Sequence, residues 1–345
     1  FFEGSGLTFI NAGTDLIYAA AMLYHYTGDR DALTWSKRLA YQYVKARHPE
    51  TKLGVYQYSK PIRREIPPFN FTESKYTESK YGDRAENQLG PEFGPIAKEG
   101  YLILPSSAEN IYAHNGLIQL QIAELLGEEG KEFLEWTHEG LLAYAKYAYI
   151  PESNLLRPLW ADGTDLTGFV LPRYGYYGAA GTVFKAKKAN SLFFYTYAYA
   201  FRLINDLELW KVARSIARGH DLGDLGTLPG QNVKVNLVTK NADPVALLGV
   251  LNLYQAYKDP AYLELATVIG NNILKTKYRN KFFLESPSRV NARFSALEPL
   301  ALLALEAAYR DLPELVPPYN GGEGYIHGHF NGAGRTYDFR VIWNH

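Results

Sequence analysis

The chain of 345 residues contains no cysteine, and this absence excludes several kinds of chemistry. Disulfide bonds, thiol nucleophiles and zinc sites built on cysteine all need a residue that the sequence lacks. The redox compartment stays undecided, because a protein without cysteine can fold in an oxidising or a reducing environment. The candidate chemistry must therefore come from other side chains.

The sequence also lacks an excess of charge of either sign and a long apolar run. With 36 basic and 36 acidic residues the formal net charge is zero, so we expect no nucleic-acid partner. A membrane-spanning helix needs about 18 or more consecutive apolar residues, and no run of that length is present, so we expect no membrane partner. We expect the chain to be a monomer. The chain starts at Phe1 without methionine or a signal-like segment. We therefore expect a trimmed or missing N-terminus, which leaves a cytoplasmic and a periplasmic location both open.

Familiar catalytic motifs are absent as well. We find no Gly-x-Ser-x-Gly, no P-loop, no dinucleotide-binding glycine fingerprint after a strand and no His-Glu-x-x-His, which removes the commonest hydrolase, nucleotide and zinc-protease interpretations.

Aromatic residues, in contrast, are abundant, with 28 Tyr, 17 Phe and 5 Trp. Their flat apolar faces and, for tyrosine, a polar tip suit sugar rings, although such side chains also fill cores.

Helical hairpins recur along the chain. In each, an apolar-periodic segment ends, a short turn with Gly, Asn, Asp or Lys follows, and a second helical segment begins. Four hairpins of this kind have their turns within residues 23–33, 123–133, 201–209 and 253–263. Asp29 and Asp259 precede the second helix of their hairpins, where Asp is a good N-cap, and Pro260 suits the first helical position. Further helices are expected at about 107–124 and 295–310.

Longer irregular stretches separate these hairpins, at 51–94, 150–188 and 320–343. Hairpins of this kind pack either around an axis, as an α/α toroid, or in an open superhelix. The irregular spacing favours the toroid. We predict one all-α domain over residues 1–345, with irregular loops and possibly small β elements forming the cleft. Function is expected in these loops, since rigid scaffolds commonly carry their sites on loops.

Arg47 and His48 lie side by side where a predicted helix ends. Cationic side chains favour a helix C-terminus and proline commonly follows one, so an ordinary helix end explains the pair and Pro49. The functional alternative is that the Arg47 cation and the His48 imidazole face the loops and take part in a site there. Glu3, near the chain start, could then share a metal with His48, and such ligands suit a divalent ion such as Mn²⁺. The ordinary interpretation of Glu3 is a solvated carboxylate.

The loop over 157–178 combines arginine, aromatic residues and turn formers. Arginine can fork onto a carboxylate while aromatic rings stack on a sugar, so we predict that Arg173 binds a substrate carboxylate. The aromatic candidates for stacking are Trp160, Tyr174 and Tyr177. The alternative is a structural loop in which Arg173 pairs with Asp162 or Asp165.

The remaining histidines are weaker candidates. His327 and His329 could bind one metal if their segment were a strand, because alternate residues of a strand share a face. A surface loop is the ordinary interpretation of that segment. His114 and His138 lie within predicted helices, where a structural role is more common.

Several motifs together carry a family resemblance. They are ARHP at 46–49, GVYQY at 54–58, YGDR at 81–84, GPEFG at 90–94, PLWADGTD at 158–165 and GGEGYIHG at 321–328. With them the chain resembles the family 2 polysaccharide lyases, bacterial pectate lyases that act on pectic fragments. The resemblance implies an α/α barrel of about seven hairpins and β-elimination of polygalacturonate or oligogalacturonides. It also implies an arginine base and a transition metal, commonly Mn²⁺, with Ca²⁺, Ni²⁺ and Co²⁺ as alternatives.

The resemblance places the catalytic base at Arg47 and a metal-binding histidine at His48. Glu3 becomes the candidate for the ligand glutamate, and a further ligand histidine would lie before Phe1. A base must be uncharged, whereas arginine ordinarily stays protonated; a nearby divalent cation and Lys45 would both oppose its charge. The alternative is that Arg47 holds the uronate carboxylate while a tyrosine or water takes the proton.

Two other functional classes stay open at this point. One is an α/α-toroid glycoside hydrolase or unsaturated-uronyl hydrolase that uses Asp162 and Asp165, although two carboxylates on one loop rarely flank a sugar. The other is a non-catalytic helical-repeat binding protein.

Overall fold

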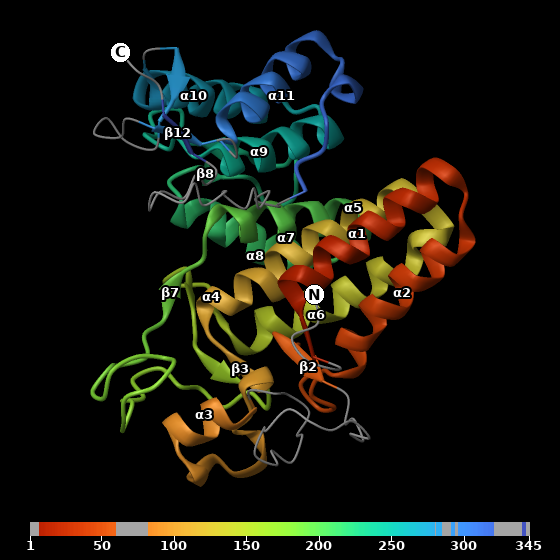
Figure 1. Cartoon of the computed structure of the whole chain (residues 1–345). Helices are drawn as coiled ribbons and strands as arrows, with labels where there is room; N and C mark the ends of the chain where they lie inside the picture. The colour runs from red at the N-terminus through yellow and green to blue at the C-terminus, as the bar shows by residue number, and fades with distance from the viewer. Residues whose placement is uncertain are drawn as a thin grey trace. The chain divides into compact units, whose positions relative to one another are not determined.

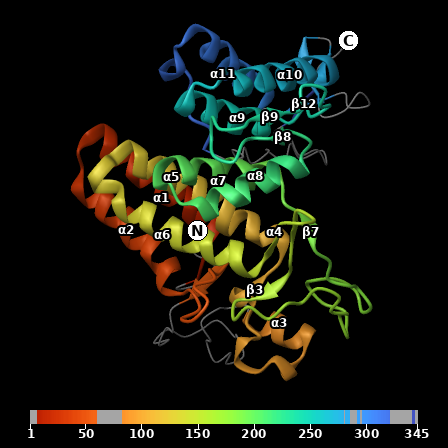
Figure 2. The same cartoon turned by 180° about the vertical axis from the view of Figure 1, so that it is seen from behind.

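The structure is a computed structural model that describes residues 7–59, 82–279, 281–284, 291–293, 296–320 and 340–342 (Figures 1 and 2). Contacts divide the chain into two compact units, Phe1–Ala189 and Asn190–His345. The single domain over residues 1–345 stays a prediction. Within the described part of the chain, none of the helices is long and apolar enough to span a bilayer.

Two helical hairpins form the framework of the first unit. α1 (Ile10–Thr27) packs against α2 (Arg30–Lys45), and α5 (Asn115–Leu126) packs against α6 (Lys131–Tyr147) across a short 3₁₀ turn (Gly127–Gly130). α1 also packs against α5 and α2 against α6, so the four helices lie side by side (Figures 1 and 2). The buried residues of α2 recur at helical spacing, which confirms the predicted amphipathic pattern.

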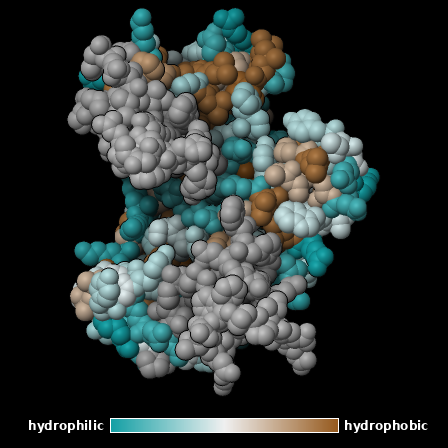
Figure 3. All heavy atoms as spheres, viewed as in Figure 1, coloured by the Kyte–Doolittle hydropathy of each residue, from teal (hydrophilic) through white to brown (hydrophobic). Residues whose placement is uncertain are grey.

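The second unit has five helices among its described residues. They are α7 (Ser191–Ile204), α8 (Leu207–Gly219), α9 (Pro244–Tyr257), α10 (Pro260–Lys277) and α11 (Glu298–Arg310). α7 packs against α8 and α9, and α9 also packs against α10 and α11. Every residue of α7 from Ser191 to Phe201 is buried, as expected of a helix that packs against others on several sides. Figure 3 shows apolar side chains gathered over α11, where Leu303 and Tyr309 are exposed.

The predicted turn chemistry of the hairpins is confirmed. Gly28 ends α1 with φ of 73°, and the Asp29 carboxylate then caps α2 by accepting from the Asp31 N–H at 2.9 Å. Asp259 caps α10 in the same way, by accepting from the Ala261 N–H at 2.9 Å. The described residues thus contain four such hairpins, fewer than the about seven that the resemblance implies.

Shorter elements join the hairpins. The described sheets are all antiparallel: β1 (Leu7–Phe9) with β2 (Gln57–Ser59); β3 (Leu102–Ile103) with β6 (Leu159–Trp160); β5 (Leu155–Leu156) between β4 (Tyr149–Ile150) and β7 (Lys187–Lys188); β8 (Gly223–Asp224) with β9 (Lys234–Val235); β10 (Tyr278–Arg279) with β11 (Phe282–Phe283); and β12 (Asn291–Arg293) with β13 (Arg340–Ile342). The expected small β elements are confirmed. α3 (Gly82–Leu89) lies near β3 (Figure 1), and α4 (Pro105–Ala108) leads through a π turn (Glu109–His114) into α5.

A separate hydrophobic cluster lies beneath the irregular loops of the first unit. Its buried members are Ala85, Leu89, Ala97, Leu102, Trp160, Leu166, Leu171 and Phe184. They come from α3, the segment between α3 and β3, β3 itself, β6 and the loop that follows β6. This cluster gives the loops a core of their own, as long connections of this type commonly need.

A charged cluster fixes the loop that follows α8 in the second unit. Arg214 binds the Asp224 carboxylate with two parallel hydrogen bonds of 2.6 and 2.8 Å, and Arg218 adds a third of 2.6 Å. The Gly226 N–H also donates to this carboxylate, at 3.0 Å. The hydrogen bond from Arg214 is the largest of the causes that hold the pKa of Asp224 well below its usual range, against partial burial.

We expect Asp224→Asn to lower the free energy of unfolding by about 1–2 kcal/mol at neutral pH, because charge-assisted hydrogen bonds are lost from a partly exposed site. A depressed native pKa stabilises the fold fully above the unfolded value of about 4; the contribution declines as the pH falls below that value and is lost as the pH falls through the lower native pKa. Urea unfolding at pH 7 and pH 3 measures the difference. A gap between the two proteins that stays constant with pH would contradict the assignment.

Candidate functional site

The Arg47 side chain joins the end of α2 to α6. Its Nη1 donates to Oε2 of Glu139 at 2.9 Å, and its Nη2 donates to the Trp136 carbonyl at 2.8 Å. Only 11% of the Arg47 side chain is exposed. Gly140 makes room for it, since a Cβ at that position would lie 3.0 Å from Arg47 Nη2. The structure thus gives Arg47 a packing role between two helices.

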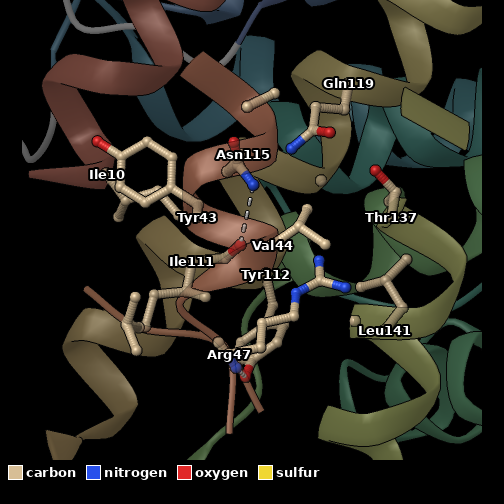
Figure 4. Close-up of a pocket in the computed structure, with 15 residues that line it drawn as sticks. Ile10, Tyr43, Val44, Arg47, Ile111, Tyr112, Asn115, Gln119, Thr137 and Leu141 are labelled. Carbon is tan, nitrogen blue, oxygen red and sulfur yellow. Dashed lines mark hydrogen bonds between the residues drawn. The ribbon is translucent and has the colours of Figure 1, made fainter. Parts of the chain in front are cut away.

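The guanidinium of Arg47 extends into a small pocket toward the helix that carries Thr137 and Leu141 (Figure 4). Tyr112, from the π turn, and Gln119 also line this pocket. The enclosed part of the pocket, about 20 Å³, has room for about one water molecule. The lining also contains two polar atoms, Gln119 Oε1 and Thr137 Oγ1, that are buried with no hydrogen-bond partner among the described residues.

Opposing effects act on the pKa of Arg47. Burial lowers the pKa of its guanidinium, while Tyr112 and Glu139 oppose this change. The net direction is the one that an arginine base requires. Burial also raises the pKa of the Tyr112 hydroxyl, which accepts a hydrogen bond from the Gly54 N–H at 2.7 Å. Tyr112 is therefore poorly suited to take a proton at neutral pH.

His48 belongs to a tight turn. Its backbone N–H donates to the Leu53 carbonyl and its own carbonyl accepts from Lys52, both at 3.0 Å. Its Nδ1 accepts two long hydrogen bonds, from the N–H groups of Glu50 at 3.4 Å and Thr51 at 3.5 Å. While Nδ1 accepts these bonds, the proton of the neutral ring lies on Nε2, so Nε2 could bind a metal only after that proton moved.

A complete metal site does not emerge from the described residues. Within the ranges that the structure describes, no three histidine or carboxylate side chains gather closely enough to hold an ion. Glu3, His327 and His329 lie outside the described residues. Of the predicted metal ligands, only His48 lies among the described residues. One imidazole is too few donors to hold a divalent ion. We derive no reaction step through a metal.

The structure brings the Arg47–His48 turn against the 157–166 loop. The Thr51 hydroxyl donates to the Ala161 carbonyl at 2.5 Å, so two segments about a hundred residues apart meet. Arg157 pairs with Asp165 at 3.2 Å, and the Asp162 carboxylate accepts from the Thr164 N–H at 2.9 Å. Both carboxylates therefore have local structural roles, which disfavours the glycoside-hydrolase alternative.

Trp160 lies in the interior and not on the loop surface. It is completely buried in the hydrophobic cluster beneath the loops, with its ring 5.5 Å from that of Phe93. The reason is its place in β6, where it pairs with Leu102 of β3. A ring without exposed area offers no face to a sugar, so the structure corrects the interpretation of Trp160 as a stacking residue.

Arg173 and Tyr174 lie on an exposed hairpin. Residues 168–184 fold back on themselves, with Val170 opposite Val183 and Gly175 opposite Gly178. Arg173 is exposed and Tyr174 is 84% exposed. Within the described parts of the chain Arg173 makes no ion pair, so the predicted alternative pairing with Asp162 or Asp165 is not observed. Tyr177 is half-buried against the hydrophobic cluster.

Sequence reasoning missed four residues that shape these sites: Tyr112, Glu139, Gln88 and Tyr176. Glu139 is 92 positions from Arg47, and Gln88 lies 90 positions from Gly178, whose carbonyl it binds. No local spacing signals contacts at such separations. Tyr176 had a signal, because it stands within the same aromatic run as Tyr174.

Comparisons with known proteins identify the family. A family model described as periplasmic pectate lyase matches residues 1–329. The pectate disaccharide-lyase of Dickeya dadantii (strain 3937) is 36% identical over 341 residues, which cover 98% of this chain and 59% of the relative. The chain thus spans about three fifths of the length of this relative.

Comparison with a solved structure shows the fold. A crystal structure of D-mannose isomerase is 12% identical, with a TM-score of 0.50, over 98% of this chain and 80% of the other. A cellobiose 2-epimerase from Bacillus thermoamylovorans is 14% identical, with a TM-score of 0.48, over 88% of this chain and 72% of the other. The fold class is α/α toroid with small antiparallel sheets, as predicted. From the family match over nearly its whole length, the chain belongs to the periplasmic pectate lyase family.

Proposed function

We propose that this chain cleaves α-1,4-polygalacturonate or oligogalacturonides by β-elimination. Family membership carries the proposal, supported by 36% identity to a pectate disaccharide-lyase over 98% of the chain. In this reaction the proton at C5 of a uronate leaves, the bond from C4 to the bridging oxygen breaks, and that oxygen takes up a proton. A C4–C5 double bond forms and no water is consumed.

Polygalacturonate with added Mn²⁺, and then with a chelator, tests the reaction. The unsaturated product absorbs in the ultraviolet, so a lyase gives an absorbance increase together with new chain ends. A hydrolase gives reducing ends without the absorbance, and a binding protein gives neither. Either of these last two results would contradict the proposal.

The assignment of Arg47 as the base stays a prediction. Burial supports it, because it lowers the pKa of the guanidinium. The ion pair with Glu139 and the burial of the Arg47 side chain, of which 11% is exposed, oppose it, because a uronate would compete with that carboxylate for the guanidinium. The alternative, in which Arg47 holds the uronate carboxylate, faces the same competition with Glu139.

We propose that Arg173 binds a uronate carboxylate next to the cleaved bond, with Tyr174 and Tyr177 as stacking surface. Exposure of Arg173 and Tyr174 on one hairpin supports this role. We expect Arg173→Ala to lower kcat/KM by about one to two orders of magnitude, since a charge-assisted contact contributes about 1.5–3 kcal/mol. Steady-state kinetics on polygalacturonate measures it. Normal kinetics with reduced stability would show a structural role.

We propose a divalent metal, Mn²⁺ before Ca²⁺, Ni²⁺ or Co²⁺, with His48 and Glu3 as ligands. Support comes from the family resemblance. We expect His48→Ala and Glu3→Gln each to weaken Mn²⁺ binding by about tenfold or more, as loss of a ligand should. Titration calorimetry with Mn²⁺ on the native chain and both variants measures this. Unchanged affinity in His48→Ala would remove His48 from the ligand set.

The remaining properties are proposals as well. The family description places its members in the periplasm, and we propose the periplasm before the cytoplasm for this chain. A monomer stays a prediction, which sedimentation velocity would test.

A further inference from the structure

One buried side chain, Gln88 of α3, holds the tip of the 168–184 hairpin. Its Nε2 donates to the carbonyls of Gly178 at 2.8 Å and Arg173 at 3.3 Å, and its Oε1 accepts from the Tyr177 N–H at 2.7 Å. Only 3% of Gln88 is exposed. A single amide thus satisfies three backbone groups on both sides of one turn.

The position of Gln88 is fixed from outside the hairpin. Its neighbours on α3, Ala85 and Leu89, are fully buried in the hydrophobic cluster that also contains Leu171. Gly175 gives the amide access to the turn, because a Cβ there would lie 2.6 Å from both Cδ and Oε1 of Gln88. The packing of α3 thus fixes Gln88 in place, and the glycine at position 175 leaves room for its amide.

The held turn presents aromatic rings to solvent. Tyr174 is 84% and Tyr176 is 69% exposed, and Arg173 is exposed beside them. Tyr177, in contrast, packs against the hydrophobic cluster, and its ring meets that of Tyr176 edge-on at 5.2 Å. Exposed aromatic side chains next to a cation match an acidic sugar chain, which offers both apolar ring faces and carboxylates.

We propose that Gln88 is a positioning residue: it fixes the turn so that Arg173, Tyr174 and Tyr176 form one binding surface for a galacturonate oligomer. Tyr176 then takes the place that sequence reasoning gave to Trp160. The inference rests on the proposed function, because it assumes that uronate chains bind at this hairpin. Gln88 touches no substrate and acts through the backbone of the turn.

Two variants of different kinds test the contact. Gln88→Met keeps the length of the side chain and removes its hydrogen bonds, while Gly175→Ala displaces the amide without altering it. The matched control is Glu86→Gln, an exposed position on the same helix. Hydrogen exchange of the peptide covering residues 172–179 reports on the turn, and titration calorimetry with tetragalacturonate reports on binding. Neither readout needs catalytic turnover.

We expect both variants to exchange this peptide faster than the control and to bind tetragalacturonate about fivefold more weakly. A loss of affinity of about fivefold is what we expect when the turn conformation that binds substrate loses the stabilisation of about one hydrogen bond. Exchange in α5 and α6 should stay unchanged. Tyr176→Ala should also weaken binding, with exchange of the turn near that of the native chain.

The outcomes separate the inference from the proposed function. If the variants leave the exchange of the turn unchanged, or raise it without changing the affinity while Arg173→Ala weakens binding, the role of Gln88 is wrong and the proposed function stands. If the native chain does not bind tetragalacturonate, or Arg173→Ala binds like the native chain, the proposed function of the hairpin is wrong and the inference fails with it.

Discussion

Replacing Arg47 with alanine or lysine should abolish elimination of polygalacturonate, with a loss in kcat of about two to four orders of magnitude if Arg47 is the base. Lysine keeps a positive charge for Glu139 but cannot reproduce two hydrogen bonds from one planar group, here to Glu139 and to the Trp136 carbonyl. The absorbance of the unsaturated product measures the rate, and circular dichroism measures the helical content, which should stay near that of the native chain.

The contacts of Arg47 require a control, because loss of an interhelical ion pair can itself reduce activity. Glu139→Gln removes the charge that faces Arg47 and leaves the guanidinium in place. A catalytic Arg47 predicts that this variant keeps most of its activity per folded molecule, while Arg47→Lys loses it. Near-normal turnover of Arg47→Lys would make the assignment wrong. Equal losses of stability in both variants, with normal kinetics at low temperature, would show that Arg47 holds α2 to α6.

Replacing Trp160 with alanine should lower the free energy of unfolding by about 3–5 kcal/mol, the range for truncating a large aromatic residue in a core. The structure gives the reason: Trp160 is fully buried and contacts the Phe93 ring within the cluster beneath the loops. Because that cluster also contains Leu171 and Phe184 at the base of the 168–184 hairpin, we expect the loss to extend to the order of the hairpin.

Urea unfolding of Trp160→Ala and Trp160→Phe measures this effect, and the phenylalanine variant should lose less because it keeps most of the buried area. Tyr174→Ala is the matched control, an aromatic truncation at an 84% exposed position in the same region. It should leave the free energy of unfolding within about 0.5 kcal/mol of the native value. A stable Trp160→Ala protein with a raised KM would restore the stacking interpretation.

The helical hairpins could be predicted because their signals are local. Apolar residues at spacings of three and four, a carboxylate cap at Asp29 or Asp259, and a left-handed residue at the turn all act within a few positions. The sequence accordingly predicted both helices of each described hairpin, and the helices near 107–124 and 295–310 are observed as 105–126 and Glu298–Arg310. The family could also be predicted, because its motifs are short runs of adjacent residues that can be recognised in the sequence.

The environment of each candidate residue was decided by tertiary structure alone. Trp160 stands in a polar, glycine-containing loop segment that favours exposure, yet pairing of β6 with β3 places it in a core. Arg47 ends a helix as predicted, yet whether it faces solvent depends on Glu139 and Gly140 of α6, about ninety residues away. Gln88 carries no chemical signal in the sequence, and its role arises only where the hairpin folds over α3. Burial and pairing depend on which distant segments meet, and residue spacing carries no information about those meetings.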